Sequence, residues 1–167
     1  MSFIGIVCES RNENCVKQIL SKRLKHNIII FFNEENISNL KNIKFETIII
    51  MTNNNKIFDK KEIFKNIISK SKYVIMNADE ELNLQLLEDI SLNIITYGFN
   101  SKSTITASSV KEESVLLCVQ RTIKDLNGLE VEPQEISIEK SNPYLATNVI
   151  LCIATTLLVY GIQKIKV

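Results

Sequence analysis

The stretch Phe45-Glu46-Thr47-Ile48-Ile49-Ile50-Met51-Thr52 decides the fold class, because it is a short and nearly continuous apolar run that is rich in isoleucine. Such a run is typical of a strand that is buried on both faces, as in a parallel sheet. Four other runs share its length and composition, and we expect them to form strands beside it: Phe3–Cys8, Asn27–Phe32, Lys72–Asn77 and Leu92–Tyr97.

Segments with apolar residues at helical spacing lie between these runs. Three such segments are marked by Cys15, Ile19 and Leu24, by Ile63, Phe64, Ile67 and Ile68, and by Leu82, Leu84, Leu86 and Leu87. Alternation of strands and helices is typical of βαβ units. The sequence therefore predicts an α/β fold with a mostly parallel sheet flanked by helices.

The pattern changes after Gly98. Thr104–Val110 and Ser114–Thr122 are half-polar runs, and Asn127-Gly128 predicts a hairpin turn that leads to a strand near Glu135–Glu139. We therefore expect a small antiparallel hairpin or sheet at about residues 103–140, appended to the α/β core. The length of 167 residues fits one domain over residues 1–167.

An uncharged C-terminal stretch fits two different structures. Pro143 is suited to the first turn of a helix, which we expect to run from about Tyr144 to Tyr160 with Gly161 as its C-cap. Residues 144–162 are close to the roughly 20 residues that cross a bilayer, so a tail anchor is the alternative to a buried core helix. Four polar residues inside the stretch favour the core helix: Thr147, Asn148, Thr155 and Thr156.

Composition narrows the classes of function. The chain has 20 basic and 19 acidic residues, a balance that gives no reason to expect nucleic acid as a partner. Its four cysteines are scattered and its only histidine is His26, so the sequence predicts no zinc site. Scattered thiols without a signal peptide predict a cytoplasmic protein.

The first strand leads to the position where a nucleotide-binding α/β protein carries its phosphate loop. Such a loop needs glycines whose backbone N–H groups approach phosphate, together with a lysine. The polar loop expected at Cys8–Asn14 has neither, and it carries the carboxylates of Glu9 and Glu13. We therefore predict that the chain has no working phosphate loop, no nucleotide cofactor and no ATP-driven catalysis of its own.

Three segments together resemble the central domain of the Mur ligase family, which makes amide bonds in bacterial cell-wall synthesis. Phe45–Asn53 is similar to the family's strand that ends in Thr-Asn, and Tyr73–Glu80 to its strand that ends in Asn-x-Asp. This second segment continues to Thr96-Tyr97-Gly98, which is similar to the family's Thr-aromatic-Gly. Asn142-Pro143-Tyr144 then leads into an apolar helix that ends in Tyr160-Gly161-Ile162, like the family's last helix. The resemblance covers about residues 45–162, and more faintly residues 3–24.

The resemblance implies a degenerate, stand-alone central domain, because the family's phosphate loop aligns on Cys8–Asn14 and is missing there. In the family, residues at the Asn-x-Asp strand end and the Asn before the last helix lie near the nucleotide. These positions correspond to Asn77, Asp79 and Asn142, which become candidate nucleotide-binding residues. A strand-end Asn and Asp that cap the following helix are the structural alternative.

The leading functional hypothesis is a non-catalytic, Mur-ligase-like domain that acts through protein contacts or self-association. The first alternative is a regulator that binds an adenine nucleotide or a cell-wall precursor weakly through Asn77, Asp79 and Asn142. The second alternative is a membrane protein anchored by residues 144–162.

Overall fold

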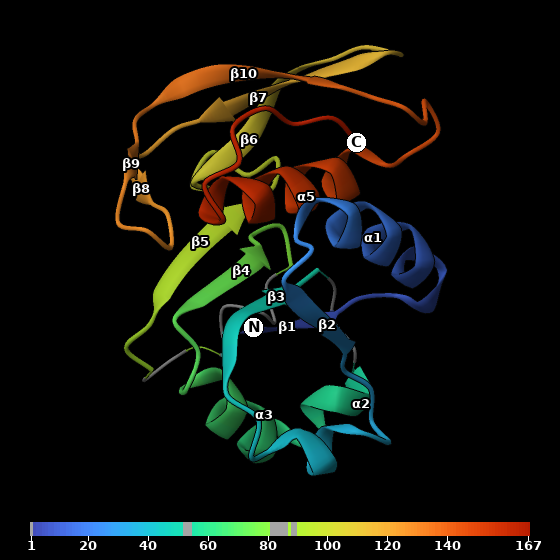
Figure 1. The fold of residues 1–167 in the computed structure, drawn as a ribbon, viewed down its shortest axis with the longest axis vertical. Helices are drawn as coiled ribbons and strands as arrows, with labels where there is room; N and C mark the ends of the chain where they lie inside the picture. Colours follow the sequence, from blue (N-terminus) through green and yellow to red (C-terminus); the bar gives the residue numbers. More distant parts are fainter. Residues whose placement is uncertain (1, 52–54, 81–86, 88–89) are drawn as a thin grey trace.

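The computed structural model, which describes residues 2–51, 55–80, 87 and 90–167, confirms the α/β class. Within these residues the main sheet has eight strands in the order β10-β7-β6-β5-β4-β3-β1-β2 (Figure 1). The strands from β1 to β6 run parallel, while β7 and β10 run antiparallel to their neighbours. Their bounds are β1 (Ser2–Val7), β2 (Asn27–Phe31), β3 (Phe45–Ile50), β4 (Tyr73–Asn77), β5 (Asn93–Tyr97), β6 (Ile105–Val110), β7 (Ser114–Val119) and β10 (Gln134–Glu139).

Helices cover both faces of the sheet and give each face its own apolar core (Figure 1). Helices α1 (Ser10–Arg23) and α5 (Thr147–Val159) pack together on one face. The other face carries α2 (Asn55–Phe58), α3 (Lys61–Ile68) and the 3-10 turn η1 (Ile37–Leu40). The first two predicted helices are therefore confirmed as α1 and α3. The third, at Leu82–Leu87, lies outside the described residues except for Leu87.

The half-polar runs after Gly98 form strands as predicted, but three of them extend the main sheet. Strand β6 joins the parallel part through the pair Tyr97 and Ile105, and β7 and β10 follow it. This placement lets α5 lie across β4, β5 and β6 and cover their apolar side chains. Within the described residues, only β8 (Ile123–Lys124) and β9 (Glu130–Val131) form a separate small sheet. Gly128, with φ of 82°, lies in the turn between them.

Helix α5 begins later than the sequence indicated. The N–H groups of Tyr144 and Leu145 bond to the side chain and the backbone carbonyl of Asn142, which makes a turn of the residues around Pro143. The helix therefore starts at Thr147, and every residue from position 149 to position 159 is buried. The C-cap residue is Tyr160, and Gly161, which we predicted as the C-cap, is the next residue, with φ of 74°.

Among the described residues, no helix is both long and apolar enough to span a membrane, so the tail-anchor alternative has no support. The hydroxyls of Thr155 and Thr156 instead donate to the carbonyls of Leu151 and Cys152, at 2.7 and 2.9 Å. These bonds satisfy the two hydroxyls inside an apolar layer, where an unbonded hydroxyl costs free energy.

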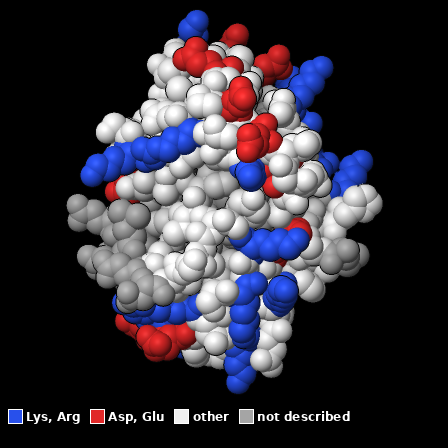
Figure 2. Space-filling view, turned by 90° about the vertical axis from the view of Figure 1, so that its left-hand side faces the viewer, with Lys and Arg blue, Asp and Glu red and all other residues white. Residues whose placement is uncertain are grey.

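Charged side chains are distributed unevenly on the side of the molecule drawn in Figure 2. Most of the acidic groups visible on this side gather toward the end built by β6, β7 and β10, whereas basic groups lie toward both ends (Figure 2).

Candidate functional site

The candidate site lies at the carboxyl ends of the parallel strands, the usual position of ligand sites in open α/β sheets. A cleft of about 430 Å³ opens there between the first turns of α1 and α5. It is lined by Glu9, Arg11, Asn12, Cys15, Met51, Glu80, Tyr97, Asn142, Tyr144, Leu145, Ala146, Asn148 and Val149. Residues that follow β1, β3 and β4, and the last residue of β5, therefore meet the segment that precedes α5.

The turn from β1 to α1 is shorter than the sequence indicated. We expected a polar loop over Cys8–Asn14, but only Cys8 and Glu9 separate β1 from the first residue of α1, Ser10. The residues from Ser10 to Asn14 are polar but compatible with a helix, and the N–H of Asn12 already bonds to the carbonyl of Glu9 at 2.9 Å. A turn of two residues is too short to surround a phosphate group with backbone N–H groups.

Carboxylates dominate the charge of this turn. Glu9 occupies the N-cap position of α1 in an extended conformation, and its carboxylate forms an ion pair with Nε of Arg11. Glu13 lies in the first turn of the same helix. Arg11 therefore meets an acidic partner on its own helix, and the anions at the start of α1 are those of the chain itself.

Tyr97, which lines the cleft, and two buried thiols that interact with it are held in their neutral forms. Burial, with a further contribution from Glu13 and Glu9, raises the pKa of Cys8 to about 12. Burial also raises the pKa of Cys152 to about 12 and that of Tyr97, which is only 1% exposed, well above its usual range. A thiol with so high a pKa carries little thiolate at neutral pH, so Cys8 and Cys152 lack the character of nucleophiles.

The first predicted site residue, Asn77, lies at the end of β4 and is buried. Its Oδ1 accepts a hydrogen bond from the N–H of Asp79 at 3.0 Å. Asn77 is absent from the cleft lining, and this contact shapes the turn that leaves β4.

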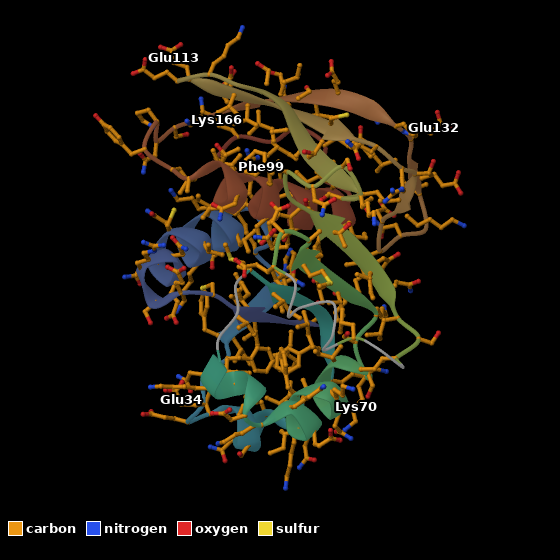
Figure 3. All side chains as sticks on the ribbon, turned by 180° about the vertical axis from the view of Figure 1, so that it is seen from behind. Glu34, Lys70, Phe99, Glu113, Glu132 and Lys166 are labelled. Carbon is orange, nitrogen blue, oxygen red and sulfur yellow. The ribbon has the colours of Figure 1, made fainter. Side chains whose placement is uncertain are left out.

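The second predicted residue, Asp79, holds the loop after β5. Its two carboxylate oxygens accept hydrogen bonds from the N–H groups of Phe99 and Asn100, at 2.8 and 2.9 Å. Gly98 lies against the same carboxylate with φ of 148°, and a Cβ at this position would approach Oδ2 of Asp79 to 2.6 Å. Phe99 projects from this loop with 58% of its surface exposed (Figure 3).

The third predicted residue, Asn142, does line the cleft. Its Oδ1 accepts the N–H of Tyr144 at 3.0 Å, and this turn places Tyr144 on the rim with 94% of its surface exposed. The structure thus brings one of the three predicted residues to the cleft. Sequence reasoning did not select Tyr144, although the Asn-Pro-Tyr turn before an apolar helix was a signal for it.

A scan against protein-family models and a search of curated proteins each gave no match to this chain. The resemblance to the Mur ligase central domain therefore depends on the residues quoted above.

Proposed function

We propose that this chain is a non-catalytic domain, similar to the central domain of Mur ligases, that acts through contacts with other proteins and between its own copies. The observation that carries the proposal is the two-residue turn after β1, in which Glu9 occupies the N-cap position and pairs with Arg11. A phosphate placed there would meet carboxylates and would find no cradle of free N–H groups.

Two exposed aromatic side chains support a role in protein contacts: Tyr144 on the rim of the cleft, and Phe99 on the loop after β5. Tyr144 is almost fully exposed and Phe99 more than half exposed, and both lie on loops adjoining the carboxyl ends of the strands. Tyrosine is enriched at protein interfaces because its ring buries a large area while its hydroxyl bonds to the partner. Hydrogen bonds to the side chains of Asn142 and Asp79 hold the backbone of the loops that carry these two residues.

A thermal-shift titration with magnesium-ATP, ADP and UDP-linked muramyl peptides tests the non-catalytic half of the proposal. A ligand bound at 100 times its Kd stabilises a protein by about 2.7 kcal/mol. For a chain of this size that corresponds to a rise of roughly 5–10 °C in Tm. We expect no saturable shift at millimolar concentrations, and a saturable shift would overturn the proposal.

The proposed contact with other proteins is tested by placing a photoreactive benzophenone amino acid at position 144. We expect discrete cross-linked products in cells, and none from the same group at Glu112, an exposed residue in the turn between β6 and β7. Equal cross-linking at both positions would contradict a contact surface around Tyr144.

Weak binding of an adenine nucleotide or a cell-wall precursor is the second candidate function. The position of Asn142 on the wall of the cleft favours it. If this function is correct, the thermal-shift titration gives a saturable rise in Tm that disappears in Asn142→Ala and remains in Glu112→Ala.

A further inference from the structure

Strand β2 is an open edge of the sheet. It is the last strand on its side and pairs only with β1 among the strands described (Figure 1). Not one of its five residues is buried, and Ile28 is 38% exposed, whereas the last four residues of β1 are all buried. Its sequence Asn-Ile-Ile-Ile-Phe contains neither lysine nor proline, which commonly protect edge strands from pairing with another chain.

The opposite edge, β10, differs in charge and in cover. Its sequence Gln-Glu-Ile-Ser-Ile-Glu carries two carboxylates. The C-terminal residues pair with its last residue, since the N–H of Val167 bonds to the carbonyl of Glu139 at 3.0 Å. Nζ of Lys166, labelled in Figure 3, forms an ion pair with Glu139 at 2.9 Å. Among the described residues, β2 is therefore the edge strand that carries apolar side chains and no charge.

The hydrogen bonds to β1 determine which backbone groups of β2 point outward. The N–H of Phe32 donates to the carbonyl of Ile6 at 2.8 Å, so residue 32 points toward β1. Backbone groups alternate in direction along a strand, so residues 28 and 30 also point inward. The N–H and C=O groups of Asn27, Ile29 and Phe31 therefore point away from the sheet.

Two of these six outward groups already have partners. The N–H of Asn27 bonds to the carbonyl of Leu24 at 3.0 Å, and Nδ2 of Asn36 donates to the carbonyl of Phe31 at 2.8 Å. Within the described part of the chain, four outward groups remain without a partner: the C=O of Asn27, the N–H and C=O of Ile29, and the N–H of Phe31.

The four remaining groups complement themselves, and from this we infer that the chain forms a twofold dimer through antiparallel pairing of β2 with β2 of a second copy. With the axis at Ile29, the two Ile29 residues exchange N–H···O bonds. The N–H of each Phe31 donates to the C=O of Asn27 of the other copy. The N–H of Asn27 and the C=O of Phe31, which are already bonded within their own chain, lie opposite one another in this register. Every outward donor and acceptor of β2 therefore has a partner in the dimer.

The side chains and charges fit the same arrangement. Ile28 lies opposite Ile30 of the second copy, which covers the most exposed apolar side chain of the strand. Basic Lys25 precedes β2, and acidic Glu34 and Glu35 follow it. Antiparallel pairing brings the basic end of each strand to the acidic end of the other, whereas parallel pairing would bring like charges together. Glu34, labelled in Figure 3, also pairs with Lys56 of its own chain at 3.2 Å, so Glu35 is the acidic group left for the second copy.

The contact closes on itself. Pairing two copies through β2 uses the β2 edge of both chains, so this twofold contact stops at a dimer with a continuous sheet. This inference rests on the proposed function, of which self-association is one part. The dimer uses a surface separate from the cleft, so either contact exists without the other, and the ligand titration and Tyr144 cross-linking test the cleft separately.

Analytical ultracentrifugation of the full chain over a range of micromolar concentrations tests the dimer. We expect a reversible monomer–dimer equilibrium, and Ile28→Lys should weaken it roughly tenfold or more, because two apolar pairs are lost by symmetry. Circular dichroism should show the variant folded, since Ile28 is partly exposed. Hydrogen exchange adds a second readout: the amides of Ile29 and Phe31 should gain protection as the concentration rises.

Charge reversal tests the register. Lys25→Glu should weaken the dimer roughly fivefold, and the added change Glu35→Lys should restore it, because unlike charges then meet again at each end. Lys17→Glu, an equal charge change at an exposed position on α1, should have no effect. A chain that stays monomeric at hundreds of micromolar, assembles beyond a dimer, or dimerises unchanged as Ile28→Lys would overturn the inference.

Discussion

Replacing Asp79 by alanine should lower the free energy of unfolding by about 2 kcal/mol. The carboxylate accepts two backbone N–H groups, from Phe99 and Asn100, at 2.8 and 2.9 Å. Hydrogen bonds to a charged acceptor contribute about 1.5–3 kcal/mol each, and the exposure of Asp79 reduces this to roughly 1 kcal/mol per bond. Asp79→Asn keeps one acceptor oxygen and should lose about half as much.

Urea denaturation at neutral pH measures this loss, followed by far-UV circular dichroism because the chain has no tryptophan. With a slope of about 2 kcal/mol per molar urea, the midpoint of Asp79→Ala should fall by about 1 M. Glu112→Ala, on an exposed turn, should change stability by less than about 0.5 kcal/mol. The contrary outcome is that Asp79→Ala changes stability as little as Glu112→Ala and yet abolishes a ligand-induced rise in Tm. Asp79 would then be a binding residue, and the structural role argued for it would be refuted.

Three other perturbations test the core. A Cβ on Gly5 would lie 2.2 Å from Cε2 of Phe32, so Gly5→Ala should cost about 1–3 kcal/mol by urea denaturation, and Phe32→Leu should recover part of it. The pKa values of Cys8 and Cys152 rise from 9.0 to about 12 on folding, so the unfolded chain loses these protons first as the pH rises. Stability should therefore decline above about pH 9, by up to about 1.4 kcal/mol per pH unit and thiol, and less steeply in Cys8→Ala. A chain that ends at Ser141 lacks α5 and should lose its cooperative unfolding transition, whereas retention of that transition would contradict a core role for the helix.

The sequence predicts the parallel part of the fold well, because each buried strand is a dense apolar run. Phe45–Thr52 became β3 (Phe45–Ile50), and the other four runs agree with the structure to within a residue or two. The arrangement of the later strands was harder to predict. Runs with one apolar and one polar face fit equally well in a separate sheet or at the end of a larger one. Contact of β6 with β5 and α5 decides between them, and this contact joins residues that are distant in sequence.

The candidate site was predicted less completely than the fold. Chain order placed Asn77 and Asp79 at the end of β4, but it could not show that their side chains bond to nearby backbone. Asn and Asp at strand ends serve both as ligand groups and as caps of turns, so residue type alone does not separate the two roles. Only the three-dimensional position of Asn142, beside the start of α1, assigns it to the cleft.

Both the charge and the geometry of the turn after β1 oppose the binding of a phosphate group. If charge were the only obstacle, neutralising Glu9 would make the start of α1 an ordinary anion site, because helix N-termini attract negative groups. The turn is also two residues long, and the N–H of Asn12 is already bonded to the carbonyl of Glu9. A phosphate cradle needs several N–H groups that converge on one point, which requires a longer loop with glycines. Removing the carboxylate therefore does not restore the cradle, and we expect the cleft to favour contacts made by aromatic and amide groups such as those of Tyr144 and Asn142.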